Sequence, residues 1–478
     1  MSRNDERFLK TKIICTIGPA SWDLAGLEAL CEAGMDVARL NMSHSEPDQV
    51  RAQAGQIRDC AARSGRPVAL LVDLQGAKIR VGRLPEPLHL SSGSRVALVP
   101  AADARVGDLP VTYADLAADL SPGDRVLLSD GQIELKVRQV SPPRVEAEVV
   151  IGGSLLSGKG VNLPGVSLRA PSLTEKDLGD IDLALEIGAE YVALSFVRSA
   201  ENVLDLRQRV TDDVLLLAKI EKDQALRELE PILEASDAVM VARGDLGTEL
   251  PFEQVPLAQK RIVRRANRRY RPVVIATQML ESMIEHPNPT RAEVSDVANA
   301  ILDGTDAILL SAETAIGRFP VESVRALTRV IREVESTSGV LPGGPPYDVP
   351  ASPPAGEPAP TELAVACATL EAVRALGAPA IVTFTRSGFT ARVVSSRRPP
   401  VPILAVTDTV KVQRQLSLVW GVLPVLCQTE PTHADMWEIA GAELLRRGLA
   451  RRGDRIVVTA GVPFHVRGTT NMVRIETL

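Results

Sequence analysis

Eight short apolar runs, each ending in polar residues, constrain the fold of this chain more than any other feature. Amphipathic, helix-like segments such as "LAGLEALCEAG" and "EKDLGDIDLALEIGAE" lie between most of them. Strands that are apolar along their whole length are buried on both faces, which requires a parallel sheet covered by helices. The runs are "KIICTIG", "DVARLNMS", "VALLVDLQG", "YVALSFVR", "VLLLAKIE", "AVMVARGD", "VVIATQM" and "AILLSAET".

Eight strand–helix units predict a closed (β/α)8 TIM barrel, an α/β fold whose chemistry lies at the C-terminal ends of the strands. An open, doubly wound sheet is the alternative. Such a sheet would gather its ligands at one switch point, whereas here polar candidates follow every run. The barrel is therefore the favoured prediction.

Two interruptions divide the chain, whose 478 residues predict two to four domains. Residues 83–169 hold short alternating strands such as "RVLLSDGQIELKV", which predicts a β-barrel lid domain inserted into the catalytic barrel of residues 1–82 and 170–337. Residues 338–360 are rich in Pro and Gly and are typical of a linker. Residues 361–478 restart a helix–strand pattern, which predicts a C-terminal α/β domain.

Composition excludes several classes of protein. The net charge of −6 argues against a general nucleic-acid binder, and no apolar run approaches the length of a membrane span. The five cysteines are scattered and are not spaced as metal ligands, which favours reduced thiols. "MSRNDERFLK" lacks the apolar core of a signal peptide. We therefore expect a cytoplasmic protein with neither nucleic-acid nor membrane partners.

Two carboxylates and a lysine at neighbouring strand ends suggest a metal-assisted reaction on an anion. Lys219 and Glu221 are two residues apart, so both point to the same face of the fifth strand. Asp245 follows the sixth strand. Glu221 and Asp245 together suit Mg²⁺ or Mn²⁺, and Lys219 would face the reacting anion. A structural Lys–Glu pair with a turn aspartate is the alternative interpretation of these three residues.

Further polar residues follow strands two and seven. Arg39, Asn41 and Ser43 share one face of strand two, where an arginine suits a phosphate or carboxylate. His44, next to them, fits a capping role better than that of a base. Thr277 follows strand seven and is suited to a substrate carboxylate or to a backbone hydrogen bond. The sequence contains no GxxxxGK[ST] or GxGxxG loop, so a nucleotide must bind without one.

The C-terminal segment contains a strand-to-helix turn rich in hydroxyl groups, "TFTRSGFTAR". Hydroxyls and backbone N–H groups at the start of a helix form an anion site, although such a turn also serves as a simple cap. A phosphate bound there would be regulatory, because the turn is far from the barrel residues in the sequence. The candidates are Thr383, Thr385, Ser387, Gly388 and Thr390.

Together these motifs resemble those of the pyruvate kinase family, in family order and over nearly the whole chain. The most specific is "PTRAEVSDVANAILDGTDAILLSAETA". The others are "KIICTIGPAS", "DVARLNMSH", "DLQGAKIRVG", "SGKGVNLPG", "LTEKD", "ALSFVRS", "AKIE", "MVARGDLG" and "ATQMLESMI". The chain departs from the family at Ala77, where proline is usual, and at Ser45, where glycine is common. Both changes are expected to alter loop stiffness more than chemistry.

The resemblance implies phosphoryl transfer from phosphoenolpyruvate to ADP, giving pyruvate and ATP. By the resemblance, Lys219 stabilises the transferred phosphoryl group and Arg39 contacts it. Glu221 and Asp245 hold Mg²⁺, and Gly244, Asp245 and Thr277 receive the substrate carboxylate. The nucleotide side is formed by Asn41, Ser43, His44, Arg80 and Lys159. A homotetramer and activation by a phosphorylated metabolite in the C-terminal domain are also implied.

Lys78 marks a branch of the family. Many members have an acidic residue there and bind K⁺ through residues that match Asn41, Ser43, Asp73 and the carbonyl of Leu74. The branch with lysine also has Leu74 and an aliphatic residue at Val81, as this chain does. Because an ammonium group supplies the single positive charge of K⁺, the hypothesis is that activity needs Mg²⁺ but not K⁺. The alternative is that Lys78 contacts phosphate while K⁺ still binds.

Two other functions remain as alternatives. A Mg²⁺-dependent aldol lyase acting on pyruvate or phosphoenolpyruvate would also use a Glu and an Asp at barrel strand ends. It would leave the inserted lid and Lys219 without an obvious role. A catalytically inactive metabolite sensor would use only the C-terminal site, and retention of Lys219, Glu221 and Asp245 argues against it.

Overall fold

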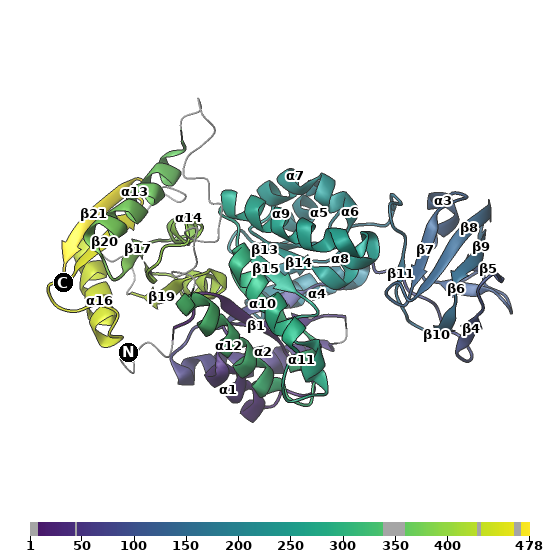
Figure 1. The fold of residues 1–478 in the computed structure, drawn as a ribbon, viewed down its shortest axis with the longest axis horizontal. Helices are drawn as coiled ribbons and strands as arrows, with labels where there is room; N and C mark the ends of the chain where they lie inside the picture. Colours follow the sequence, from purple (N-terminus) through teal and green to yellow (C-terminus); the bar gives the residue numbers. More distant parts are fainter. Residues whose placement is uncertain (1–7, 44, 338–358, 428–431, 463–469) are drawn as a thin grey trace.

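The structure is a computed structural model that describes residues 8–43, 45–337, 359–427, 432–462 and 470–478. His44 and most of the Pro-rich segment predicted as a linker lie outside the described residues. A central (β/α)8 barrel lies between a β-rich module on the right of Figure 1 and a C-terminal α/β unit on the left. Within the described part, no helix is long and apolar enough to cross a membrane.

The predicted barrel is confirmed. Eight parallel strands close in the order β1-β16-β15-β14-β13-β12-β3-β2, and each coincides with one of the eight apolar runs. Their bounds are β1 Lys12–Thr16, β2 Val37–Asn41, β3 Ala69–Asp73, β12 Tyr191–Leu194, β13 Leu215–Ile220, β14 Ala238–Ala242, β15 Val273–Ala276 and β16 Ala307–Leu310.

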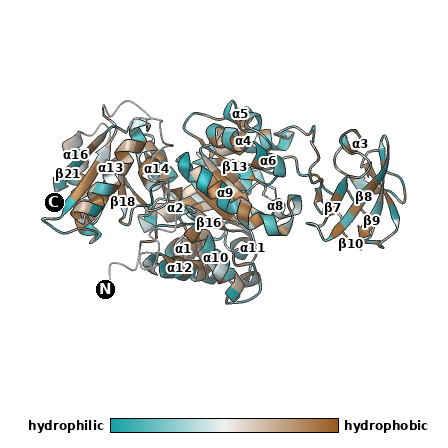
Figure 2. Cartoon of the chain, turned by 45° about the horizontal axis from the view of Figure 1, so that its top comes forward, coloured by the Kyte–Doolittle hydropathy of each residue, from teal (hydrophilic) through white to brown (hydrophobic). Residues whose placement is uncertain are grey.

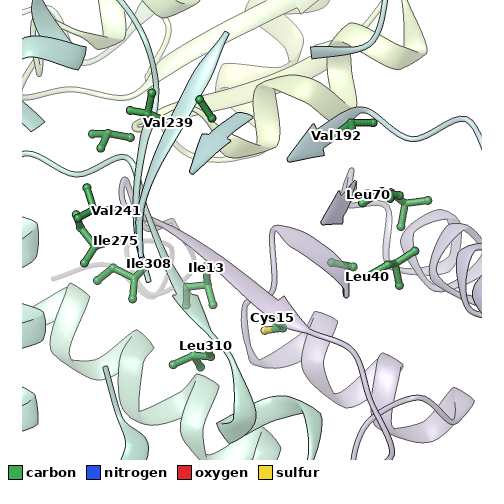
Figure 3. Packing of buried hydrophobic residues seen from close by; sticks show 14 of the residues in the cluster. Ile13, Cys15, Leu40, Leu70, Val192, Val239, Val241, Ile275, Ile308 and Leu310 are labelled. Carbon is green, nitrogen blue, oxygen red and sulfur yellow. The ribbon is translucent and has the colours of Figure 1, made fainter. Parts of the chain in front are cut away.

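Alternation along the strands separates two apolar layers. Ile14 and Leu217 belong to a cluster that fills the barrel interior, with at least one buried residue from every strand. Ile13 and Cys15, on the opposite face of β1, pack with the surrounding helices in a larger cluster, part of which is drawn in Figure 3. Burial on both faces explains why the runs are apolar throughout.

Helices cover the outside of the barrel and carry both hydrophobic and hydrophilic residues, as Figure 2 shows. Capping boxes start three of them: Thr174 with Asp177 at α4, Ser199 with Asn202 at α5, and Thr290 with Glu293 at α10. The helices are α1 Leu24–Ala33, α2 Pro47–Ser64, α4 Glu175–Glu186, α5 Ala200–Arg207, α6 Asp223–Arg227, α7 Leu229–Ala235, α8 Arg243–Glu249, α9 Val255–Arg268, α10 Arg291–Asp303, α11 Ala312–Ala315 and α12 Pro320–Thr337. Two short 3₁₀ turns, η1 Phe252–Gln254 and η2 Glu281–Ile284, lie between them.

The insertion after β3 is all-β apart from one short helix, α3 Leu116–Asp119. Six of its strands form a sheet in the order β11-β7-β8-β9-β5-β6, and β4 pairs with β10. The chain that enters the module connects the two edges of that sheet. Arg80 bridges to Gly160 beside the edge strand β11, and Val81 bridges to Val111 of the other edge strand, β6, so the sheet is closed. The strands are β4 Leu88–Leu90, β5 Arg95–Pro100, β6 Leu109–Val111, β7 Arg125–Leu128, β8 Ile133–Ser141, β9 Arg144–Ile151, β10 Gly153–Leu155 and β11 Val161–Asn162.

The C-terminal unit is a five-stranded sheet in the order β19-β18-β17-β20-β21, parallel except for the last pair. Apolar clusters lie on both sides of the sheet. Its elements are α13 Thr361–Leu376, β17 Ile381–Phe384, α14 Phe389–Ser395, β18 Ile403–Thr407, α15 Val410–Gln415, η3 Leu416–Leu418, β19 Val422–Leu426, α16 His433–Arg446, β20 Arg455–Ala460 and β21 Met472–Thr477.

This unit closes the N-terminal end of the barrel. Leu418 packs into the cluster that fills the barrel interior, and the Tyr191 hydroxyl donates to the carbonyl of Gln415. The buried guanidinium of Arg398 donates to both carboxylate oxygens of Asp306, at 3.0 and 2.9 Å, and lies 5.0 Å from the Trp420 ring. Apolar contact and a buried ion pair therefore hold the barrel and the C-terminal unit together.

Replacing Arg398 by methionine tests how much this ion pair contributes. Arg398→Met keeps the apolar stem but leaves Asp306 buried without its cation, so unfolding free energy should fall by about 3–5 kcal/mol. Urea denaturation followed by circular dichroism measures the change. Arg374→Met, which breaks an exposed pair with Glu371, is the control and should cost less than about 1 kcal/mol. Equal small losses in both variants would contradict a structural role for the buried pair.

Candidate active site

A buried ionic network lies at the C-terminal ends of the barrel strands. Arg39 on β2, Asp73 on β3 and Lys219 on β13 meet there, together with Ser195 after β12 and Glu221 after β13. Because all barrel strands run parallel, their polar C-terminal ends converge on one rim. The structure thus brings together residues far apart in the sequence.

Lys219 is the centre of the network. Its ammonium donates to Ser195 Oγ at 2.8 Å and lies 3.0 Å from Glu221 Oε1 and 3.3 Å from Asp73 Oδ1. Burial alone disfavours the charge, but Asp73 and Glu221 outweigh it and raise the pKa of Lys219. Lys219 is therefore a fixed positive charge at neutral pH, shielded from water.

Arg39 and Asp73 form the other half of the network. Arg39 Nε donates to Asp73 Oδ2 at 2.7 Å, and Nη1 donates to Thr16 Oγ1 at 2.9 Å. Burial opposes ionisation of Asp73, yet the charges of Lys219 and Arg39 outweigh it and lower the pKa of the carboxyl. Asp73 thus holds two cations side by side at the rim, an arrangement suited to a polyanionic substrate.

Glu221 and Asp245 offer carboxylates from adjacent strand ends. Glu221 accepts the backbone N–H of Phe196 at 2.7 Å, and burial together with the nearby Asp245 charge raises its pKa, although Lys219 opposes the shift. Asp245 Oδ1 accepts from Lys78 at 3.0 Å.

The donor set fits a hard divalent cation that keeps several of its own waters or substrate oxygens. Within the residues described, no group of three or more His, Cys, Asp or Glu side chains is placed to hold a metal.

The turn after β15 lies against the start of α8. The Gly244 N–H donates to Thr277 Oγ1 at 2.8 Å, and Arg243 Nη2 donates to the Thr277 carbonyl at 2.8 Å. Thr277 and Gln278 adopt φ values of +69° and +54°, which are unfavourable for residues with side chains. Such strain is typical of residues held in place for a functional reason.

Strands β2 and β3 place Asn41 opposite Asp73 in register. Ser43 N–H donates to Asn41 Oδ1 at 3.3 Å, and the Leu74 carbonyl accepts from Ser195 Oγ at 2.7 Å. The residues that the family resemblance gives as K⁺ ligands thus come from two paired strand ends.

Lys78 has a partner of its own. Its ammonium is paired with Asp245 and lies 5.6 Å from the centroid of the Phe196 ring. The residue singled out in the sequence as a substitute for K⁺ is thus bound to a candidate Mg²⁺ ligand in this structure.

Two of the residues assigned to the nucleotide, Arg80 and Lys159, lie at the base of the β-rich module. Arg80 Nη1 donates to the Gly158 carbonyl at 3.0 Å, and the Val81 N–H donates to the Lys159 carbonyl at 2.8 Å. The Lys159 side chain is exposed. His44 lies outside the described residues.

The candidate regulatory turn joins β17 to α14. Gly388 has a φ of +75°, and Thr390 is buried and hydrogen-bonded to the Thr470 hydroxyl at 2.9 Å. The Thr383 hydroxyl is buried with no hydrogen-bond partner in the described part of the chain. Thr385 and Ser387 are partly exposed between them.

The sequence did not predict two residues at or near the barrel rim, Ser195 and Asp177. Ser195 bridges Lys219 and the Leu74 carbonyl, and buried Asp177 accepts the Gly76 N–H at 3.0 Å while it caps α4. A hydroxyl directly after an apolar run was the available signal for Ser195. Asp177 lies in "LTEKD", where the capping pattern explains its hydrogen bonds with Thr174 but not the one from Gly76.

Comparisons with known proteins cover nearly all of the chain. Residues 8–324 match the family "Pyruvate kinase, barrel domain", and residues 363–476 match "Pyruvate kinase, alpha/beta domain". The chain is 42% identical to "Pyruvate kinase" from Agrobacterium vitis over 98% of both chains, and 42% identical to that of Mycobacterium tuberculosis over 97% of this chain and 98% of its relative.

A solved structure agrees with this assignment. A crystal structure of a pyruvate kinase from Cryptosporidium parvum covers 100% of this chain and 98% of its own, with a TM-score of 0.92 and 33% identity. Similarity in sequence and in structure thus extends over both the barrel and the C-terminal unit. The chain belongs to the pyruvate kinase family.

Proposed function

We propose that this enzyme transfers the phosphoryl group of phosphoenolpyruvate to ADP at the rim of the barrel, giving pyruvate and ATP. The observation that carries the proposal is the buried ammonium of Lys219, held between Asp73 and Glu221 beside the guanidinium of Arg39. Phosphoryl transfer needs positioning and charge neutralisation more than a covalent nucleophile. Fixed cations in a site shielded from water provide both.

Each residue has a distinct role in this proposal. Lys219 and Arg39 neutralise the oxygens of the phosphoryl group as its bond to the enolate oxygen breaks and its bond to ADP forms. Glu221 and Asp245 would hold Mg²⁺, or Mn²⁺ in its place, which supplies charge stabilisation to phosphate and enolate oxygens. The backbone of Gly244 and Asp245, with Thr277, receives the substrate carboxylate. The enolate then takes up a proton to become pyruvate.

The nucleotide is proposed to bind between the barrel rim and the inserted module. Asn41, Ser43 and His44 contribute from the barrel, and Arg80 and Lys159 contribute from the base of the module. The module would act as a lid that excludes water during transfer. Its position beyond the rim in Figure 1 is suited to that role.

The remaining expectations concern organisation and regulation. We propose a catalytic barrel of residues 1–82 and 170–337, a lid of residues 83–169, a linker of residues 338–360 and a regulatory domain of residues 361–478. The turn from Thr383 to Thr390 would bind the phosphate of an activating metabolite. The enzyme is proposed to be a cytoplasmic homotetramer acting in the last step of glycolysis.

Product analysis separates this reaction from an aldol cleavage at the same rim. With phosphoenolpyruvate, ADP and Mg²⁺, ATP and pyruvate should appear in equal amounts, and removal of any one component should stop both. Luciferase measures ATP, and lactate dehydrogenase measures pyruvate. Cleavage of a 2-keto acid without formation of ATP would refute the proposal in favour of the lyase. Effector binding without turnover would favour the sensor.

We further propose that turnover does not require K⁺, because the sequence resembles the branch of the family in which a lysine at the position of Lys78 supplies the positive charge of that ion. In a tetramethylammonium buffer free of Na⁺ and K⁺, kcat should stay within about twofold of its value in K⁺. The variant Lys78→Glu is the control and should gain a K⁺ requirement of about tenfold or more, since the charge is then missing. A collapse of wild-type activity without K⁺ would contradict the proposal.

A further inference from the structure

Lys78 forms an ion pair with Asp245, a carboxylate that the proposed reaction needs for its metal ion. Lys78 Nζ lies 3.0 Å from Asp245 Oδ1, and the two side chains are equally shielded, each 23% exposed. A divalent cation on Asp245 would face this ammonium at close range, and like charges so near each other repel strongly in a partly buried site. Lys78 must therefore leave Asp245, or weaken metal binding there.

Lys78 also lies where the chain enters the lid module. Two residues later Arg80 bridges to Gly160, and the Val161 N–H donates to the Ile79 carbonyl at 2.9 Å. The stem of Lys78 runs directly against the lid: a Cβ on Gly160 would lie 3.4 Å from Lys78 Cε. The lysine thus reaches from the base of the lid to the barrel rim.

A second set of acceptors lies beside the same glycine. The position of a Cβ on Gly160 is 3.6 Å from Asp130 Oδ1 and 3.7 Å from Asn162 Oδ1, so both oxygens lie beside the glycine that the Lys78 stem approaches. Asn162 is 3% exposed, and its Oδ1 is buried with no hydrogen-bond partner among the described residues. Buried polar atoms are normally satisfied, so this oxygen needs a donor.

We propose that Lys78 is a movable counter-ion, which neutralises Asp245 in the metal-free enzyme and passes to Asn162 and Asp130 of the lid when a divalent cation binds. The inference rests on the proposed metal site at Glu221 and Asp245. Lysine suits the role because its compact charge sits on a flexible stem. Lys78 is then a positioning residue. Its two positions, on Asp245 and on the lid acceptors, couple metal binding to the lid.

The Phe196 ring is positioned to guide the movement. It lies 5.6 Å from the Lys78 ammonium, and the Phe196 N–H is fixed to Glu221, the other candidate metal ligand. Lys222 lies 5.9 Å from the same ring, but its charge is paired with buried Glu249 at 2.6 Å. Of these two lysines, therefore, only Lys78 is expected to compete with the metal.

Binding of Mn²⁺ alone, without substrates, tests the competition. Titration followed by electron paramagnetic resonance gives the Kd, and Lys78→Met should lower it by about fivefold or more because Asp245 becomes free. Lys222→Met is the matched control: it removes one cation near the same ring and should change the Kd less than about twofold. An unchanged Kd in Lys78→Met, or equal tightening in both variants, would overturn the proposal.

Two further variants test the transfer of Lys78 to the lid and the metal site separately. Asn162→Leu removes one of the two lid acceptors for Lys78, so Mn²⁺ should bind about threefold more weakly, and this loss should vanish in a Lys78→Met background. A loss that persists in that background would contradict the transfer to Asn162. Asp245→Asn should abolish tight Mn²⁺ binding; if it does not, the proposed metal site itself is wrong. If Asp245→Asn behaves as expected but the Lys78 and Asn162 variants do not, the metal site stands and the movable counter-ion is refuted.

Discussion

The ammonium of Lys219, buried at the rim of the barrel, is the interaction on which the candidate site depends. A buried charge is tolerated only when paired and hydrogen-bonded, and Lys219 meets this requirement through Asp73, Glu221 and Ser195. One of these partners, Asp73, also fixes the position of Arg39. One structural necessity, to compensate a buried lysine, therefore arranges two cations and two carboxylates around one point.

The closed barrel makes this arrangement possible. Its strands supply polar ends to one rim from residues as far apart in the sequence as Arg39 and Thr277, while the opposite end is closed by Leu418 and the pair of Arg398 with Asp306. The lid module enters and leaves the barrel near that rim, and its sheet is closed by the residues next to Lys78. Lys78 thus precedes the lid by a few residues in the sequence and is held at the rim by its ion pair with Asp245.

Much of this could be predicted from the sequence, because the strongest signals were local. Apolar runs predicted all eight barrel strands, and spacing placed Lys219 and Glu221 on one face. Contacts that depend on tertiary structure could not be predicted in the same way. Ser195 looked like any hydroxyl after a strand, and nothing in "AKIRVG" indicated that Lys78 would pair with Asp245, far along the chain. The inward packing of Leu418 into the barrel was equally hidden.

The central claim is that the charge of Lys219 serves the reaction and not only the fold. The most direct test is the kcat of Lys219→Met at saturating phosphoenolpyruvate, ADP and Mg²⁺, with near-ultraviolet circular dichroism to confirm the folded state. Loss of a preorganised charge at the reacting group should lower kcat by about 10²–10³-fold. A folded variant that keeps more than about a tenth of the wild-type kcat would contradict this account.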